Sequence, residues 1–93
     1  MTGEHLDAIL KSAQAKADKD GYQVVPEGGA LTLYVAHDGV SLTVGRVEAL
    51  RVDGELVYAR TARREVFALG RSDLFAVALE GAVGLPARRA GFG

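Results

Sequence analysis

The sequence predicts a small mainly β (α+β) domain, in which an N-terminal helix precedes about five or six antiparallel strands that form a small, strongly bent sheet or barrel. Apolar residues repeat with helical spacing up to Gly21, whereas apolar and polar residues alternate two by two from Tyr22 to about Leu79. The strand candidates follow one another through short turns without an intervening helix. Because parallel strands need much longer crossovers, the sheet is expected to be antiparallel.

Residues 3–20 are expected to form an amphipathic helix. Thr2 precedes this segment as a capping hydroxyl, and Gly21 follows it as a residue that easily adopts the left-handed conformation at a helix end. Lys16 and Lys19 would then lie at the negative end of the helix dipole. The apolar face would consist of five residues at steps of three and four, namely Leu6, Ile9, Leu10, Ala13 and Ala17.

Six later segments have the alternation or the apolar run of a β-strand. Asp38-Gly39 and Asp53-Gly54 lie between consecutive candidates, and Asp-Gly tolerates the positive φ angles of a two-residue hairpin turn. The last candidate is apolar on both faces, which favours association of an edge strand unless the helix or another subunit covers it. The candidates are 22–25, 31–36, 40–52, 55–61, 65–69 and 74–79.

Gly45 interrupts the alternation inside the longest strand candidate. Up to Val44 the apolar residues share one parity, whereas Val47 and Ala49 fall on the other. A glycine at such a slip is typical of a β-bulge or a sharp bend. The pattern therefore favours a curled sheet, but it leaves open which set of residues faces inward.

Length and composition are those of one small domain, which we assign to residues 1–80, with 81–93 as a flexible C-terminal tail. The chain has 93 residues, a net charge of −1 and no cysteine, so neither a disulfide nor a thiolate metal site supports the fold. The N-terminus lacks a signal-peptide pattern, and no apolar run approaches the roughly 20 residues of a membrane span. We therefore expect a cytoplasmic protein that is not associated with a membrane.

Residues that carry catalytic or metal chemistry are scattered along the chain. The two histidines are His5, in the predicted helix, and His37, beside a predicted turn. Glu4 and Asp7 lie too close to His5 in the sequence to converge with it on a metal from one helix face. We therefore predict no catalytic residue, no metal site and no cofactor.

Arginines are the most suggestive polar residues, since every lysine lies before residue 20 and every arginine from Arg46 onward. Arg60, Arg63 and Arg64 span a strand end and a turn, where several guanidinium groups can meet one anionic partner. Tyr58 is a nearby aromatic residue that the sequence pattern does not assign to the core. These four residues are the candidate binding residues for a protein or nucleic-acid partner, and a merely solvated turn is the alternative.

From Leu31 to Gly81 the layout is similar to the Sm-like (LSm) fold and, more broadly, to SH3-like small β-barrels. The run from Leu31 to Gly39 resembles the first strand and turn of that family, and Gly45 resembles the bend glycine of its long second strand. Asp53 falls near the position of an acidic loop residue. The resemblance implies rings that join edge strands and bind RNA in a central pore, but it assigns no RNA-contacting residue to this chain.

The sequence favours a non-catalytic module for protein–protein interaction or self-assembly, because it combines near-neutral charge with a small core and no catalytic constellation. The alternative is an Sm-like or LytTR-like nucleic-acid-binding domain that uses the arginine-rich strand half, with an affinity that falls steeply with salt. A small hydrolase that uses His37 with Asp38 is the remote alternative.

Overall fold

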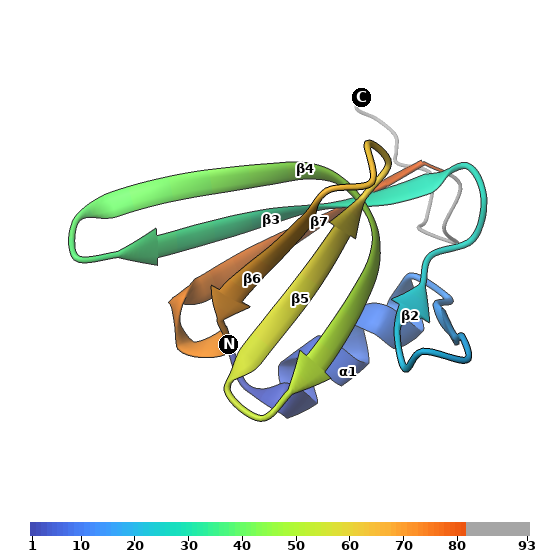
Figure 1. Ribbon diagram of the computed structural model, residues 1–93, viewed down its shortest axis with the longest axis horizontal. Helices are drawn as coiled ribbons and strands as arrows, with labels where there is room; N and C mark the ends of the chain where they lie inside the picture. The colour runs from blue at the N-terminus through green and yellow to red at the C-terminus, as the bar shows by residue number, and fades with distance from the viewer. Residues whose placement is uncertain (82–93) are drawn as a thin grey trace.

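The computed structural model describes residues 1–81, which form one N-terminal helix and seven antiparallel strands in a strongly curled half-barrel (Figure 1). The predicted fold class is confirmed. Of the predicted tail, residues 82–93 lie outside the described residues. The elements are α1 (Gly3–Ser12), β1 (Lys16–Ala17), β2 (Gln23–Val24), β3 (Gly29–His37), β4 (Val40–Asp53), β5 (Leu56–Thr61), β6 (Val66–Gly70), the short 3-10 helix η1 (Arg71–Asp73) and β7 (Leu74–Gly81).

The sheet curls because the long strand β4 has different neighbours along its two halves. β3 pairs with the first half, up to Val47, and β5 pairs with the second half, from Val47 to Asp53. β7 adds to β3 and β6 adds to β5, so the order along the curl is β7-β3-β4-β5-β6. Figure 1 shows that the β3–β4 hairpin consequently extends well beyond the other strands.

The predicted bulge in the long strand is present. Leu31 lies opposite Val47 and Leu33 lies opposite Val44, so β4 carries one residue more than β3 between these pairs. Val44 and Val47 are both buried, so residues of both parities face the core, one on each side of the bulge. The sequence pattern had left this question open. The left-handed residue of the bulge is Arg46, with a φ of 56°, and not the neighbouring glycine.

The helix is shorter than predicted and ends at Ser12. Gln14 follows in the left-handed conformation, with a φ of 60°. The Gln14 N–H donates to the carbonyl of Lys11, and the Ala15 N–H donates to the carbonyl of Leu10, which is the Schellman arrangement of a helix end. Glycine usually occupies the left-handed position of that arrangement, so the sequence pattern gave no sign of an end here.

The end of the segment predicted as helix forms β1, the first strand of a small hairpin, and β1 pairs with β2, which lies within the predicted strand 22–25. The Asp18 carboxylate holds its turn by accepting hydrogen bonds from the N–H groups of Asp20 and Tyr22, at 2.8 and 3.0 Å. Gly21 adopts a φ of 87° within this turn and not at a helix end. Ala17 is exposed, so the apolar face of the helix stops at Ala13.

Helix and sheet share one hydrophobic core. The Thr2 hydroxyl caps α1 by accepting a hydrogen bond from the His5 N–H at 3.1 Å, as predicted. α1 directs its apolar face into the curl, where it meets residues from β3, β4, β5, β6 and β7. The buried residues of this core are Leu6, Leu10, Ala13, Val25, Leu31, Leu33, Val35, Val44, Val47, Leu50, Val57, Ala59, Leu69 and Leu74.

Candidate binding surfaces

The outer face of β5 carries two of the four predicted binding residues, Tyr58 and Arg60, because the alternate residues of this strand are buried in the core. The Arg60 guanidinium lies 3.4 Å from the carboxylate of Glu48 and 3.9 Å from that of Asp18. Its side chain is only 31% exposed. Arg60 therefore already has two anionic partners within the fold.

Arg51 on β4 joins these residues in an arginine–tyrosine cluster of Tyr22, Arg51, Tyr58 and Arg60. The Arg51 guanidinium lies 4.4 Å from the ring centroid of Tyr58, and the Arg60 guanidinium lies 5.0 Å from that of Tyr22. Such cation–π contacts stabilise the fold where the β1–β2 hairpin meets β4 and β5. The sequence did not indicate Arg51 and Tyr22 as candidates, because only the pairing between strands brings them next to the β5 residues.

The turn between β5 and β6 carries the other two predicted binding residues, Arg63 and Arg64. The buried Thr61 hydroxyl accepts hydrogen bonds from the N–H groups of Arg63 and Glu65, at 3.3 and 3.2 Å. Arg64 has a φ of 67°, and the turn sends the two arginines to different surfaces. Arg64 lines a hollow with Arg60, whereas Arg63 lines a separate one. The structure therefore does not gather the three predicted arginines into one site.

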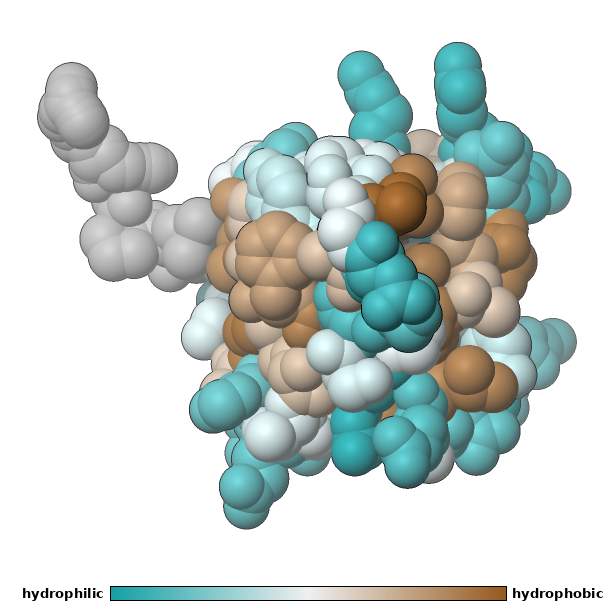
Figure 2. Space-filling view, turned by 90° about the vertical axis from the view of Figure 1, so that its left-hand side faces the viewer, coloured by the Kyte–Doolittle hydropathy of each residue, from teal (hydrophilic) through white to brown (hydrophobic). Residues whose placement is uncertain are grey.

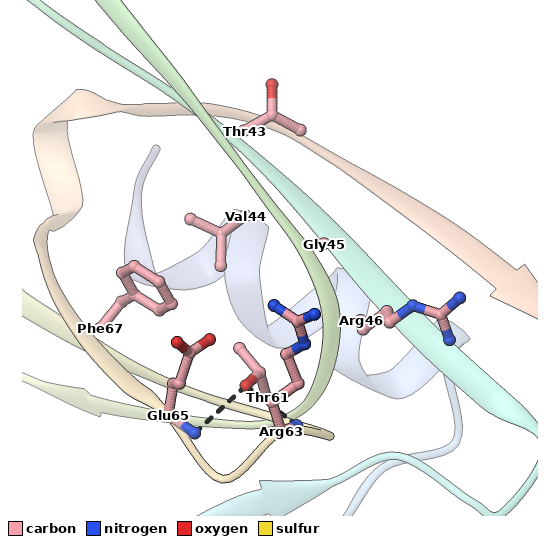
Figure 3. Close-up of a pocket in the computed structure, with 8 residues that line it drawn as sticks. All are labelled: Thr43, Val44, Gly45, Arg46, Thr61, Arg63, Glu65 and Phe67. Atoms are coloured by element: carbon pink, nitrogen blue, oxygen red, sulfur yellow. Dashed lines mark hydrogen bonds between the residues drawn. The ribbon is translucent and has the colours of Figure 1, made fainter.

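The second hollow, which we call the β4–β6 groove, lies where the turn after β5 diverges from β4. It has a volume of about 350 Å³. Figure 3 shows that Phe67 and Val44 face one another across it, that the Arg63 side chain extends into it, and that Arg46 points away from its centre. Its lining residues are Thr43, Val44, Gly45, Arg46, Thr61, Arg63, Glu65 and Phe67.

The groove has a basic margin and one acidic group. Within residues 1–81, neither Arg46 nor Arg63 forms an ion pair, in contrast to Arg60. The Glu65 carboxylate points into the groove, but it makes no ion pair with either arginine. The formal charge of the lining is therefore +1, and a guanidinium group is available for an anion.

His37 lies at the far end of the projecting hairpin. Its Nδ1 atom lies 2.9 Å from the Asp73 carboxylate, and its Nε2 atom lies 3.3 Å from that of Asp38. The His37 side chain is 68% exposed and lines neither of the two hollows described above. Among the described residues, no three His, Cys, Asp or Glu side chains are grouped closely enough to hold a metal ion.

Exposed large apolar side chains lie on the β3–β4 hairpin, beside the turn between β4 and β5, and on β6 and β7, the outer strands of the curl. β6 and β7 each have a strand partner on one side only, within the part of the chain that the structure describes. Figure 2, which views the molecule from the hairpin side, shows hydrophobic patches between hydrophilic side chains. The large apolar residues that are exposed are Val40, Leu42, Val52, Leu56, Val66 and Phe75.

Comparison of the chain with protein-family models, with curated proteins and with solved structures gives no match. None of the helices in residues 1–81 has both the length and the apolar character needed to cross a membrane.

Proposed function

We propose that this chain is a non-catalytic protein–protein interaction module that assembles with copies of itself through the open edges of its curled sheet. The observation that carries this proposal is that both outer strands of the curl expose a large apolar side chain, Val66 on β6 and Phe75 on β7, at 55% and 62% exposure. Edge strands are usually protected, most simply by charged side chains. β6 has no charged residue, and β7 has only Glu80.

The two open edges belong to different strands, so the expected contact is head-to-tail. β6 of one copy would pair with β7 of the next, so an open assembly would keep one free β6 edge and one free β7 edge at its ends. Repetition of such a contact gives a closed ring or an open chain, depending on the rotation between neighbours. This is also the type of assembly that the similarity to Sm-like folds implies.

Light scattering coupled to gel filtration tests the proposal. The wild-type chain is expected to form oligomers at high micromolar concentration. Val66→Lys and Phe75→Lys place a charge on one edge each, and each variant alone should be unable to grow beyond a monomer. Val52→Lys is the matched control, because Val52 is 37% exposed in the second half of β4, where it pairs with Val57 of β5.

A mixture of the two edge variants provides a stricter test. The Val66→Lys chain keeps its β7 edge, and the Phe75→Lys chain keeps its β6 edge. One intact contact is therefore possible between unlike chains, and the mixture should contain a heterodimer and nothing larger. A strictly monomeric wild type, or oligomers unaffected by both substitutions, would contradict self-assembly.

Nucleic-acid binding is the second candidate, and it is favoured by Arg63 and Arg64, which have no ion-pair partner within the described residues. Because Arg60 is compensated by Glu48 and Asp18, binding should depend on the turn arginines and not on Arg60. An oligonucleotide shift assay at about 50 mM salt, where electrostatic contact is strongest, compares Arg63→Ala/Arg64→Ala with Arg60→Ala. Absence of binding by the wild type in that assay excludes this candidate.

A further inference from the structure

We propose that the β4–β6 groove binds the C-terminal end of a partner peptide in an extended conformation, with its terminal carboxylate on Arg63. The peptide would add a strand to the free edge of β4. This inference is independent of self-assembly, because it uses the edge of β4 and not the outer edges of β6 and β7.

The first half of β4 has a free edge. From Val40 to Val47 this strand pairs with β3 on one side, and β5 joins its other side only from Val47 onward. Within residues 1–81, no strand lies beside the opposite edge from Val40 to Gly45. Unpaired N–H and C=O groups along such an edge are a template for an extended peptide, and this mode of binding gives main-chain affinity without a large interface.

The free edge ends abruptly at the turn that follows β5. The Ala62 N–H donates a hydrogen bond to the carbonyl of Arg46 at 2.9 Å, so the backbone of the turn occupies the edge at that point. A strand added from Val40 towards Arg46 meets Thr61 and Ala62 there and has no space to continue. The geometry therefore favours a chain end, not the middle of a longer strand.

The charged groups at this closed end determine whether the N-terminus or the C-terminus of a peptide fits there. Arg63 extends into the groove, and neither it nor Arg46 has an acidic partner within the described residues. A guanidinium group binds a carboxylate through two parallel hydrogen bonds, whereas it repels a terminal ammonium. The bound peptide therefore has its carboxylate near Arg63 and runs parallel to β4.

Side chains beside the free edge indicate what precedes the carboxylate. Val44 and the partly buried Phe67 provide an apolar floor. Gly45 has no heavy atom within 4 Å of the position that a Cβ would occupy, so a peptide backbone can approach it closely. Because alternate side chains of an added strand face the same way, apolar residues at every second position suit this floor.

Nuclear magnetic resonance titration of the ¹⁵N-labelled full chain tests this inference. The probe is an N-acetylated hexapeptide of alternating threonine and valine with a free C-terminal carboxylate, and the control is the same peptide with a C-terminal amide. Amide shifts are expected at 43–46 and 61–65. The carboxylate peptide should bind at least roughly tenfold more tightly, which is the loss expected for one charge-assisted hydrogen bond.

Three variants separate the role of the groove from general attraction to a basic surface. Arg63→Gln should weaken binding of the carboxylate peptide roughly tenfold, whereas Arg64→Gln, which changes the other hollow, should leave it unaltered. Glu65→Gln should strengthen it, because a like charge is removed. Equal binding of acid and amide, equal effects of the two arginine variants, or no shifts at millimolar peptide would each overturn the inference. None of these results depends on the oligomeric state.

Discussion

Arg46 is one of the residues at which the backbone adopts a left-handed conformation that the side chain disfavours. Its φ of 56° is a left-handed conformation that costs an ordinary residue about 1–2 kcal/mol. We therefore expect Arg46→Gly to raise the free energy of unfolding by up to about 1 kcal/mol, after the larger chain entropy of glycine is subtracted. Urea denaturation followed by circular dichroism measures this change.

The same substitution at Arg51 is the control for this prediction. Arg51 has no positive φ and stacks on Tyr58, so Arg51→Gly should lower stability by about 1 kcal/mol or more. Equal losses in both variants would contradict the strain argument. The alternation in the sequence located this bulge correctly, but it associated the bulge with Gly45. The alternation of apolar and polar residues shows where a strand contains an extra residue, but it does not show which residue adopts the positive φ.

At the level of elements, the sequence predicted a boundary correctly where the residues of the adjoining turn were typical of that turn. Asp38-Gly39 was predicted as a hairpin, and both residues have positive φ angles in the structure. The end of α1 was missed because Gln14 takes the position where glycine is usual. β2 falls within the predicted strand 22–25, but its partner β1 was missed, because a strand of two residues is too short to show alternation. Asp18 holds the turn between them through hydrogen bonds that no spacing reveals.

The β5–β6 turn depends on a single buried hydroxyl. Thr61→Val keeps the shape of the side chain but removes the acceptor for the N–H groups of Arg63 and Glu65, which should cost about 1–2 kcal/mol of unfolding free energy. Amide hydrogen exchange at these two positions should accelerate more than elsewhere in the sheet. Thr61→Ser retains the acceptor, so protection of the two amides should persist. Unchanged exchange in Thr61→Val would show that the hydroxyl does not hold the turn.

At the scale of the whole molecule, the spacing of apolar residues predicted the architecture but not the candidate binding surfaces. The change from helical spacing to alternation determines which side chains the chain must bury, so a helix on a curled antiparallel sheet follows. The β4–β6 groove depends instead on where β5 stops along β4, and the arginine–tyrosine cluster depends on the register that sets Arg51 opposite Tyr58. Both are properties of pairing between distant segments, and one sequence contains no direct signal for them.

The single core predicts that α1 and the sheet unfold together. Leu6 is fully buried among residues of the sheet, so Leu6→Ala should lower the free energy of unfolding by about 2–5 kcal/mol through lost contacts and a residual cavity. Leu56→Ala makes the same chemical change at 42% exposure and should cost much less. Helical circular dichroism and tyrosine fluorescence, which monitors the sheet, should show coincident transitions in both variants. Loss of the helix signal ahead of the sheet signal would mean that the half-barrel is stable without α1, contrary to the packing of Leu6, Leu10 and Ala13 in its core.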